Sequence, residues 1–224
     1  TGPIEGVVVS DGVTVTTTDA QGIYQMRVKR NAPFVFVSVP AEYEIPVENG
    51  MPKIYKKIAM GDNDVVQRSF KLERTGKKER FTLLALADVQ IGRDDEVTML
   101  DNEVLPFLIP YVQQELEVPV YGISLGDLVW DNMPFHEVYK QRIRKIGVPI
   151  FQVIGNHDHD KAITVDADAD ASFEAAFGPT YYSYNIGDCH FVVLDDVLYT
   201  GSSSYTADIT DEQMAWLEQD LKYV

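Results

Sequence analysis

The sequence is poor in cysteine, and it contains no long apolar run. Cys189 is the only cysteine among 224 residues, which excludes an internal disulfide and leaves the redox compartment undetermined. No apolar run approaches the ~20 residues that a membrane-spanning helix needs. The chain starts with Thr1 and not with Met, which indicates a processed or engineered start. We therefore expect a secreted or periplasmic protein whose signal sequence has been removed.

Basic residues are also scarce, and their distribution along the chain is uneven. The chain has 19 Lys and Arg against 35 Asp and Glu, a net charge of -16. Residues 1–80 carry 12 basic and 10 acidic residues, whereas the remaining residues carry 7 and 25. An acidic surface repels a phosphate backbone, so no nucleic-acid partner is expected. It also concentrates cations, although solubility alone is another explanation for the charge.

The first 74 residues show short β-type segments separated by turn residues such as Asp11-Gly12 and Glu48-Asn49-Gly50. This pattern predicts an N-terminal all-β sandwich over residues 1–74, and residues 7–24 resemble the regulatory-like sandwich modules of many secreted hydrolases. Packing or spacing is the expected role, with glycan or cell-wall binding as the alternative. The predicted strands, rich in Val, Ile, Thr and aromatics, cover residues 4–9, 13–18, 23–28, 34–39, 54–60 and 65–72.

A polar stretch over residues 75–80 is the predicted linker, and residues 81–224 form the second predicted domain. Apolar segments alternate there with helical patterns, which favours an α/β arrangement. The acidic run at residues 166–170 is expected to be a solvated loop, because it lacks the glycine and final Glu of a calcium-binding loop. The expected strands are 81–87, 120–125, 148–154, 181–186 and 190–194, and the expected helices are 97–116, 134–146 and one that starts with the capping box at 210–213.

Three of the predicted strands end in polar residues. The first runs into Asp88-Val89-Gln90, the second into Gly126-Asp127, and the third into Gly155-Asn156-His157-Asp158. Asn-His-Asp alone is compatible with an ordinary turn. Three strands with the same kind of ending instead indicate one polar site at the carboxyl edge of a sheet.

In their order and spacing, these three motifs resemble the first signatures of the calcineurin-like metallophosphoesterases, over residues 81–224. The resemblance implies an αββα-type domain with two divalent metal ions and a bridging hydroxide that attacks phosphorus. It implies that Asp127 is shared by both ions, that Asp88 and Gln90 bind the first ion, and that Asn156 binds the second. His157 would protonate the leaving oxygen or hydrogen-bond the phosphoryl group, and Asp158 would orient the His157 ring.

The chain departs from the family pattern at two places. Gln90 stands where the family usually has His, and its amide oxygen favours Mn²⁺ or Mg²⁺ over Fe or Zn²⁺, although one branch of the family also carries Gln. The later His and Gly-His-x-His motifs are missing. His190 precedes its strand, and His136 and His159 are expected at the surface or behind the ligands. We therefore expect a domain that is C-terminally incomplete, with weak metal binding and little turnover.

The sequence thus predicts metal-dependent hydrolysis of a small phosphoester, without distinguishing monoester from diester. The alternative is a noncatalytic glycan- or envelope-binding protein with a degenerate metallophosphoesterase shell. Trp130, Asp131 and Asn132 either line the substrate entrance or pack under a loop, and Arg93 is a candidate phosphate contact. An incomplete sheet edge would favour self-association.

Overall fold

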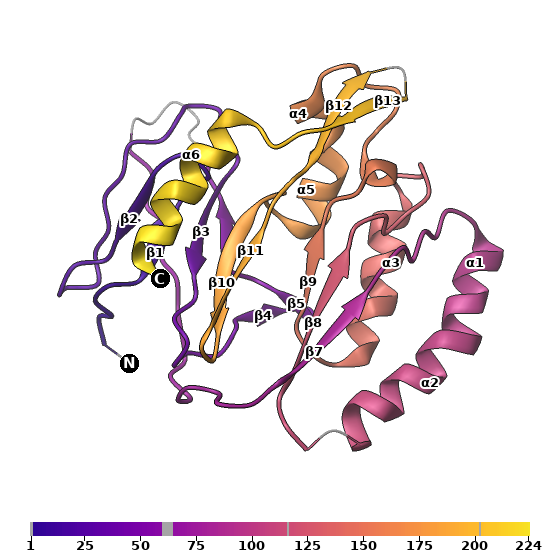
Figure 1. Cartoon of the computed structure of the whole chain (residues 1–224), viewed down its shortest axis with the longest axis horizontal. Helices are drawn as coiled ribbons and strands as arrows, with labels where there is room; N and C mark the ends of the chain where they lie inside the picture. The colour runs from indigo at the N-terminus through magenta and orange to yellow at the C-terminus, as the bar shows by residue number, and fades with distance from the viewer. Residues whose placement is uncertain (1, 60–64, 116, 202) are drawn as a thin grey trace.

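The computed structural model describes residues 2–59, 65–115, 117–201 and 203–224, and it combines antiparallel β-sheet, a parallel sheet and helices (Figure 1). The predicted strand over 54–60 and the predicted helix over 97–116 each end at a residue outside this described part, Met60 and Leu116. Within the described part, no helix is both long enough and apolar enough to cross a membrane.

The N-terminal region forms one antiparallel sheet with the strand order β2-β1-β3-β6, and a short β4-β5 hairpin lies beside it. Two predicted strands, 23–28 and 65–72, are not strands. Their backbone pairs with no other strand of the described residues, and side-chain bonds such as Tyr24 Oη to the Arg68 carbonyl connect them instead. Apart from the β4-β5 hairpin, the second sheet of the predicted sandwich is therefore not formed by the described residues of 1–74. The strands are β1 Val8–Ser10, β2 Val15–Thr17, β3 Phe34–Ser38, β4 Val47–Glu48, β5 Met51–Pro52 and β6 Tyr55–Lys57.

The N-terminal sheet shares its apolar core with the rest of the chain. The rings of Phe36 in β3 and Trp216 in α6 (Asp211–Asp220) pack edge to face with their centroids 6.1 Å apart. The backbone nitrogen of Asn185, in β10 (Tyr182–Ile186), donates to the Val39 carbonyl over 3.2 Å. This bond joins β10 to the end of β3. Figure 1 shows α6 beside β1 and β3, although most of the chain separates them. The predicted linker at 75–80 therefore does not separate two independent cores.

A parallel sheet with the order β7-β8-β9 forms the centre of the second region. One face packs against α1 (Asp94–Met99), α2 (Leu105–Pro110), α3 (Phe135–Ile143) and α5 (Ala171–Phe177), and the other packs against the hairpin of β10 and β11. Phe151 of β9 stacks on Tyr184 of β10 with the ring centroids 3.5 Å apart. This layered arrangement confirms the predicted α/β pattern. The strands are β7 Thr82–Leu86, β8 Val120–Leu125, β9 Ile150–Val153, β11 Cys189–Val193, β12 Val197–Gly201 and β13 Ser204–Ala207.

The first helical segment runs from Asp94 to Glu115 as alternating α-helical and π-helical stretches. Pro106 and Pro110 lie within this segment, in α2, and a π-helical turn precedes and follows α2. These π-helical turns accommodate the N–H groups that the prolines lack, so the helix does not end there. The acidic run at 166–170 is not a solvated loop, because four of its residues form α4 and Asp170 is buried. The helices are α1 Asp94–Met99, α2 Leu105–Pro110, α3 Phe135–Ile143, α4 Asp166–Ala169 and α5 Ala171–Phe177.

Candidate metal centre

The carboxyl ends of β7, β8 and β9 bring three of the predicted residues, Asp88, Asp127 and Asn156, to one open cleft. Neighbouring parallel strands end at the same edge of their sheet, so the polar residues after them converge. The cleft has a volume of about 500 Å³. Its other lining residues are Leu125, Val153, Ile154, Gly155, Leu194, Asp196, Val197 and Ile209.

The backbone at this edge adopts an uncommon conformation. Asp88, Gln90 and Asp127 have φ angles of 51°, 49° and 50°, in the left-handed region that non-glycine residues rarely occupy. Such strain persists only where the surrounding structure holds it, and it gathers at functional sites. Here the Gln90 backbone nitrogen donates to the Asp127 backbone carbonyl over 2.9 Å, and this bond joins the loop after β7 to the loop after β8. At Gly155 there is no room for a side chain, because an added Cβ would collide with the backbone nitrogen of Asp127.

Gln90 connects the two carboxylates of the cleft. Its side-chain nitrogen lies 3.3 Å from Asp88 Oδ1 and 3.0 Å from Asp127 Oδ2. Two carboxylates and two amides offer hard oxygen ligands, which suit Mg²⁺ or Mn²⁺. No histidine is among the described residues that line the cleft. The donor set thus fits divalent ions that prefer oxygen.

His157 lies next to Asp127 and is held on several sides. Its backbone nitrogen donates to Asp127 Oδ1 over 3.1 Å, and its ring Nδ1 lies 2.7 Å from Asp131 Oδ1. The Trp130 ring stacks on the imidazole with centroids 3.9 Å apart. Lys161 Nζ is 2.5 Å from the same Asp131 oxygen. Burial pushes the pKa of Asp131 upward, but Lys161 and His157 outweigh it and lower that pKa below its ordinary value.

The prediction that Asp158 orients the His157 ring is wrong, because Asp158 faces away from it. Asp158 is fully buried and accepts hydrogen bonds from the backbone nitrogens of Leu128, Val129 and Gly155. Residues 156–158 form a 3₁₀ turn, in which consecutive side chains diverge by about 120°. A carboxylate directly after His157 in sequence therefore points elsewhere, and Asp131 contacts the ring.

Several residues near the site were not assigned a role from the sequence. Asp196 lines the cleft. It could have been found from the sequence, because it is a carboxylate that follows soon after a predicted strand, as Asp88 is. Asp131 lies in the stretch predicted either to line the substrate entrance or to pack under a loop, and nothing in the sequence marked Lys161. Arg93 Nε lies 3.1 Å from Asp95 Oδ1 and its Nη2 lies 2.7 Å from Glu96 Oε1, so it is paired within its own helix start and not with the cleft.

The comparison with family models concerns the N-terminal region, which precedes the three motifs. Residues 1–75, a third of the chain, match the family model of the N-terminal part of calcineurin-like phosphoesterases. This N-terminal region is thus similar to the N-terminal part of calcineurin-like phosphoesterases. No curated protein matches the sequence. The solved structure of a purple acid phosphatase from yellow lupin (Lupinus luteus) seeds is similar over 63% of this chain, with 14% identity and a TM-score of 0.42. The chain spans 27% of that structure's length, and this weak likeness carries no part of the argument below.

Proposed function

We propose that this calcineurin-like phosphoesterase chain hydrolyses a small phosphoester with divalent metal ions held in the cleft at the ends of β7, β8 and β9. The observation that carries the proposal is the convergence of Asp88, Asp127 and Asn156 on that cleft, with Gln90 between the two carboxylates. An exported location fits the proposal, as does a substrate small enough for a cleft of about 500 Å³.

The residues of the cleft divide into two groups of ligands around Asp127. Asp88 and Gln90 would hold one ion, Asn156 the other, and Asp127 both. A pair of divalent ions lowers the pKa of bound water and offsets charge on the phosphoryl oxygens. The His157 backbone N–H fixes one oxygen of Asp127 and the Gln90 amide contacts the other, so the carboxylate is oriented before any ion binds.

His157 would hydrogen-bond the phosphoryl group or protonate the leaving oxygen. Its Nδ1 is bonded to Asp131, which leaves Nε2 for the substrate. Stacking on Trp130 and the pairing of Asp131 with Lys161 hold the ring in place, so that little orientational freedom is lost in the reaction. Orienting the ring is thus the role we assign to Asp131.

We further propose that turnover by this chain is weak and favours Mn²⁺ or Mg²⁺. The ion next to Asn156 has only that amide and Asp127 as assigned ligands, and no histidine lines the cleft among the described residues. Few protein ligands mean weak binding, with water completing the shell.

The test is hydrolysis of p-nitrophenyl phosphate and bis(p-nitrophenyl) phosphate with Mn²⁺, Mg²⁺ or EDTA. We expect slow turnover that depends on the metal and that falls more than about 100-fold in Asp127→Asn, beyond the loss seen when residues behind metal ligands are changed. The matched control is Asp168→Asn, an exposed carboxylate outside the cleft, which should leave the rate unchanged.

Two results would contradict the proposal in different ways. No metal-dependent turnover at any Mn²⁺ concentration would favour a noncatalytic binding protein. Fast turnover, equal in wild type and Asp127→Asn, would show that the ligand assignment is wrong. Comparing the two substrates also decides whether a monoester or a diester is preferred.

A further inference from the structure

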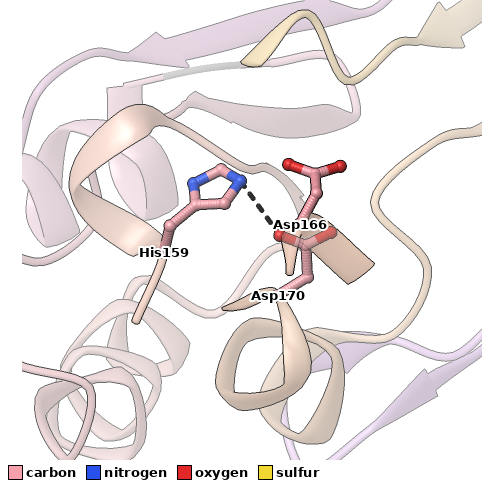
Figure 2. A group of neighbouring side chains, drawn as sticks. All are labelled: His159, Asp166 and Asp170. Atoms are coloured by element: carbon pink, nitrogen blue, oxygen red, sulfur yellow. Dashed lines mark ion pairs between the residues drawn. The ribbon is translucent and has the colours of Figure 1, made fainter. Parts of the chain in front are cut away.

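A second group of potential ligands lies outside the cleft. His159 follows the 3₁₀ turn, Asp166 begins α4, and Asp170 precedes α5. One ligand atom from each lies within 4.8 Å of the other two. Figure 2 shows the His159 imidazole facing the Asp170 carboxylate, with Asp166 beside them. None of the three lines the cleft of Asp88 and Asp127.

Two buried atoms of this group have no hydrogen-bond partner in the described part of the chain. They are His159 Nε2 and Asp170 Oδ1. The two atoms lie 2.9 Å apart and face each other as an ion pair, and neither has a further polar partner in the described part of the chain. His159 is fully buried and Asp170 is 7% exposed. Buried polar atoms are nearly always satisfied by a partner, so a pair that is left over indicates a bound species.

The hydrogen bond on the other side of the His159 ring shows which nitrogen is available. Nδ1 lies 2.9 Å from the Gly155 carbonyl, which can only accept, so Nδ1 carries a proton. In a neutral ring this leaves a lone pair on Nε2, directed toward the carboxylates. A histidine that binds a metal usually donates its second nitrogen to a carbonyl or carboxylate in this way.

The spacing of the ligand atoms also fits one ion. Two ligands at about 2.1 Å from a metal and at right angles to each other are about 3.0 Å apart. At the tetrahedral angle of a zinc site the same two ligands would be about 3.4 Å apart. The Nε2 to Oδ1 distance of 2.9 Å is close to the right-angle value, and all three ligand atoms lie within 4.8 Å of one another.

The surroundings of the group carry excess negative charge. Burial, reinforced by Asp170, raises the pKa of Glu174 and of Asp195 to about 7 each. Burial lowers the pKa of His159, but Asp170 and Asp195 outweigh it and raise that pKa. Lys57 partly opposes the charge of Glu174, but within the described residues no Lys or Arg forms an ion pair with these carboxylates. A divalent cation would supply the missing positive charge.

We propose that His159, Asp166 and Asp170 bind one divalent ion of the kind that accepts both imidazole and carboxylate, Zn²⁺ or Mn²⁺. This site is separate from the catalytic cleft and does not depend on the proposed function. The ion connects the segment after Asn156 and His157 to α4. Tyr199 of β12 completes the surroundings, because its ring stacks on His159 at 5.7 Å and its backbone nitrogen donates to Asp166. The ion would thereby stabilise the loop that carries His157.

The experiment measures bound metal in the full chain after dialysis against EDTA and then against Zn²⁺ or Mn²⁺. Asp127→Asn serves as the background, since it weakens binding in the cleft. We expect this background to retain one tightly bound ion and to show a metal-dependent rise in unfolding temperature. Adding either Asp170→Asn or His159→Gln should remove both effects, whereas adding the exposed Asp168→Asn should remove neither.

Each alternative outcome decides against the site. If the Asp127→Asn background binds no ion, His159 and Asp170 form only a buried ion pair. If Asp170→Asn and His159→Gln both retain the ion, other residues bind it. Equal binding of Ca²⁺ that His159→Gln does not weaken would exclude the imidazole as a ligand. Circular dichroism of each variant separates loss of metal from loss of fold. Activity in the cleft is measured separately, so failure of either proposal can be recognised without the other.

Discussion

Asp158 holds together the two loops that carry the candidate ligands Asp127 and Asn156. Its carboxylate accepts from backbone nitrogens of Leu128 and Val129, after β8, and of Gly155, after β9. His136 Nε2 lies 3.3 Å from the same group. A carboxylate offers acceptors only, whereas an amide would place an NH₂ group against one of these donors.

We therefore expect Asp158→Asn to lower the free energy of unfolding by about 1–3 kcal/mol, the cost of leaving a buried donor unpaired. Urea unfolding followed by circular dichroism measures the change. Asp168→Asn, which alters an exposed carboxylate, should stay within about 0.5 kcal/mol of wild type. If the two variants are equally stable, Asp158 does not hold the loops together.

At the residue scale, the sequence was enough to predict that Asp88, Asp127 and Asn156 reach the cleft, but not that Asp196 does, nor how His157 is held. Asp88, Asp127 and Asn156 could be found because each follows an apolar strand, and parallel strands share an edge. The contact between His157 and Asp131 joins residues that are 26 positions apart, and it depends on the turns after β8 and β9. Turn geometry at this detail is not encoded in residue spacing. Sequence adjacency suggested Asp158 instead, and that was wrong.

At the scale of elements, α6 connects the end of the described chain to the N-terminal sheet. Trp216 is fully buried, packs against Phe36 and Tyr181, and donates from Nε1 to Ser10 Oγ over 3.0 Å. Removing a buried indole leaves a large cavity, while Ser10 Oγ still accepts from the Gly12 backbone nitrogen. The stability of the sheet and of the helix is thus coupled through this side chain, together with the bond from Gln219 Nε2 to the Val13 carbonyl.

Trp216→Ala should cost about 3–5 kcal/mol of stability, the range for large core residues. Thermal or urea unfolding of the purified variant measures it. Met214, on the same helix, is 42% exposed, so Met214→Ala is the matched control and should change stability by no more than about 0.5 kcal/mol. Equal effects of both substitutions would mean that α6 is not docked on the sheet.

The elements themselves were predicted unevenly, for a physical reason. The predicted strands 34–39 and 120–125 contain mainly apolar residues that are buried on both faces of the strand. Their apolar pattern was therefore sufficient to predict them as strands. Residues 23–28 and 65–72 have similar β propensity, but no strand in the described part of the chain pairs with them. β propensity measures the fit to a sheet, and it forms a strand only where a partner exists. The partner is a property of the tertiary fold and not of the segment.

At the scale of the whole molecule, the acidic charge of the second region is partly buried beside α4 and α5. Asp195 has a pKa of about 7, raised by burial and then by Asp170, and Glu174 has a pKa of about 7 for the same reasons. Asp166 also faces Asp195 and adds negative charge, while His159 opposes it. The folded chain therefore keeps protons on these acids at pH values where the unfolded chain has lost them.

This difference predicts how stability depends on pH in EDTA. Because a raised carboxyl pKa means that the folded state binds more protons, stability is highest below about pH 4 to 5 for these groups and falls as the pH rises toward 7. The raised pKa of His159 acts in the same direction. When the pKa of a group differs by one between the folded and the unfolded chain, the free energy of unfolding changes by about 1.4 kcal/mol. The total fall between pH 5 and pH 8 should therefore be of the order of a few kcal/mol.

Asp195→Asn should make stability depend less on pH, because the asparagine side chain does not ionise. Its amide oxygen can still accept from the Val197 backbone nitrogen, which lies 3.1 Å from Asp195 Oδ1 in the wild type. Urea midpoints at pH 5 and pH 8 in EDTA provide the measurement, and Asp196→Asn, at the exposed neighbouring position, should keep the wild-type slope. Saturating Zn²⁺ should stabilise wild type more at pH 8 than at pH 5, because protons no longer compete for the carboxylates and His159. A stability that rises with pH in EDTA, or an unchanged slope in Asp195→Asn, would show that the buried acids are not protonated in the folded chain.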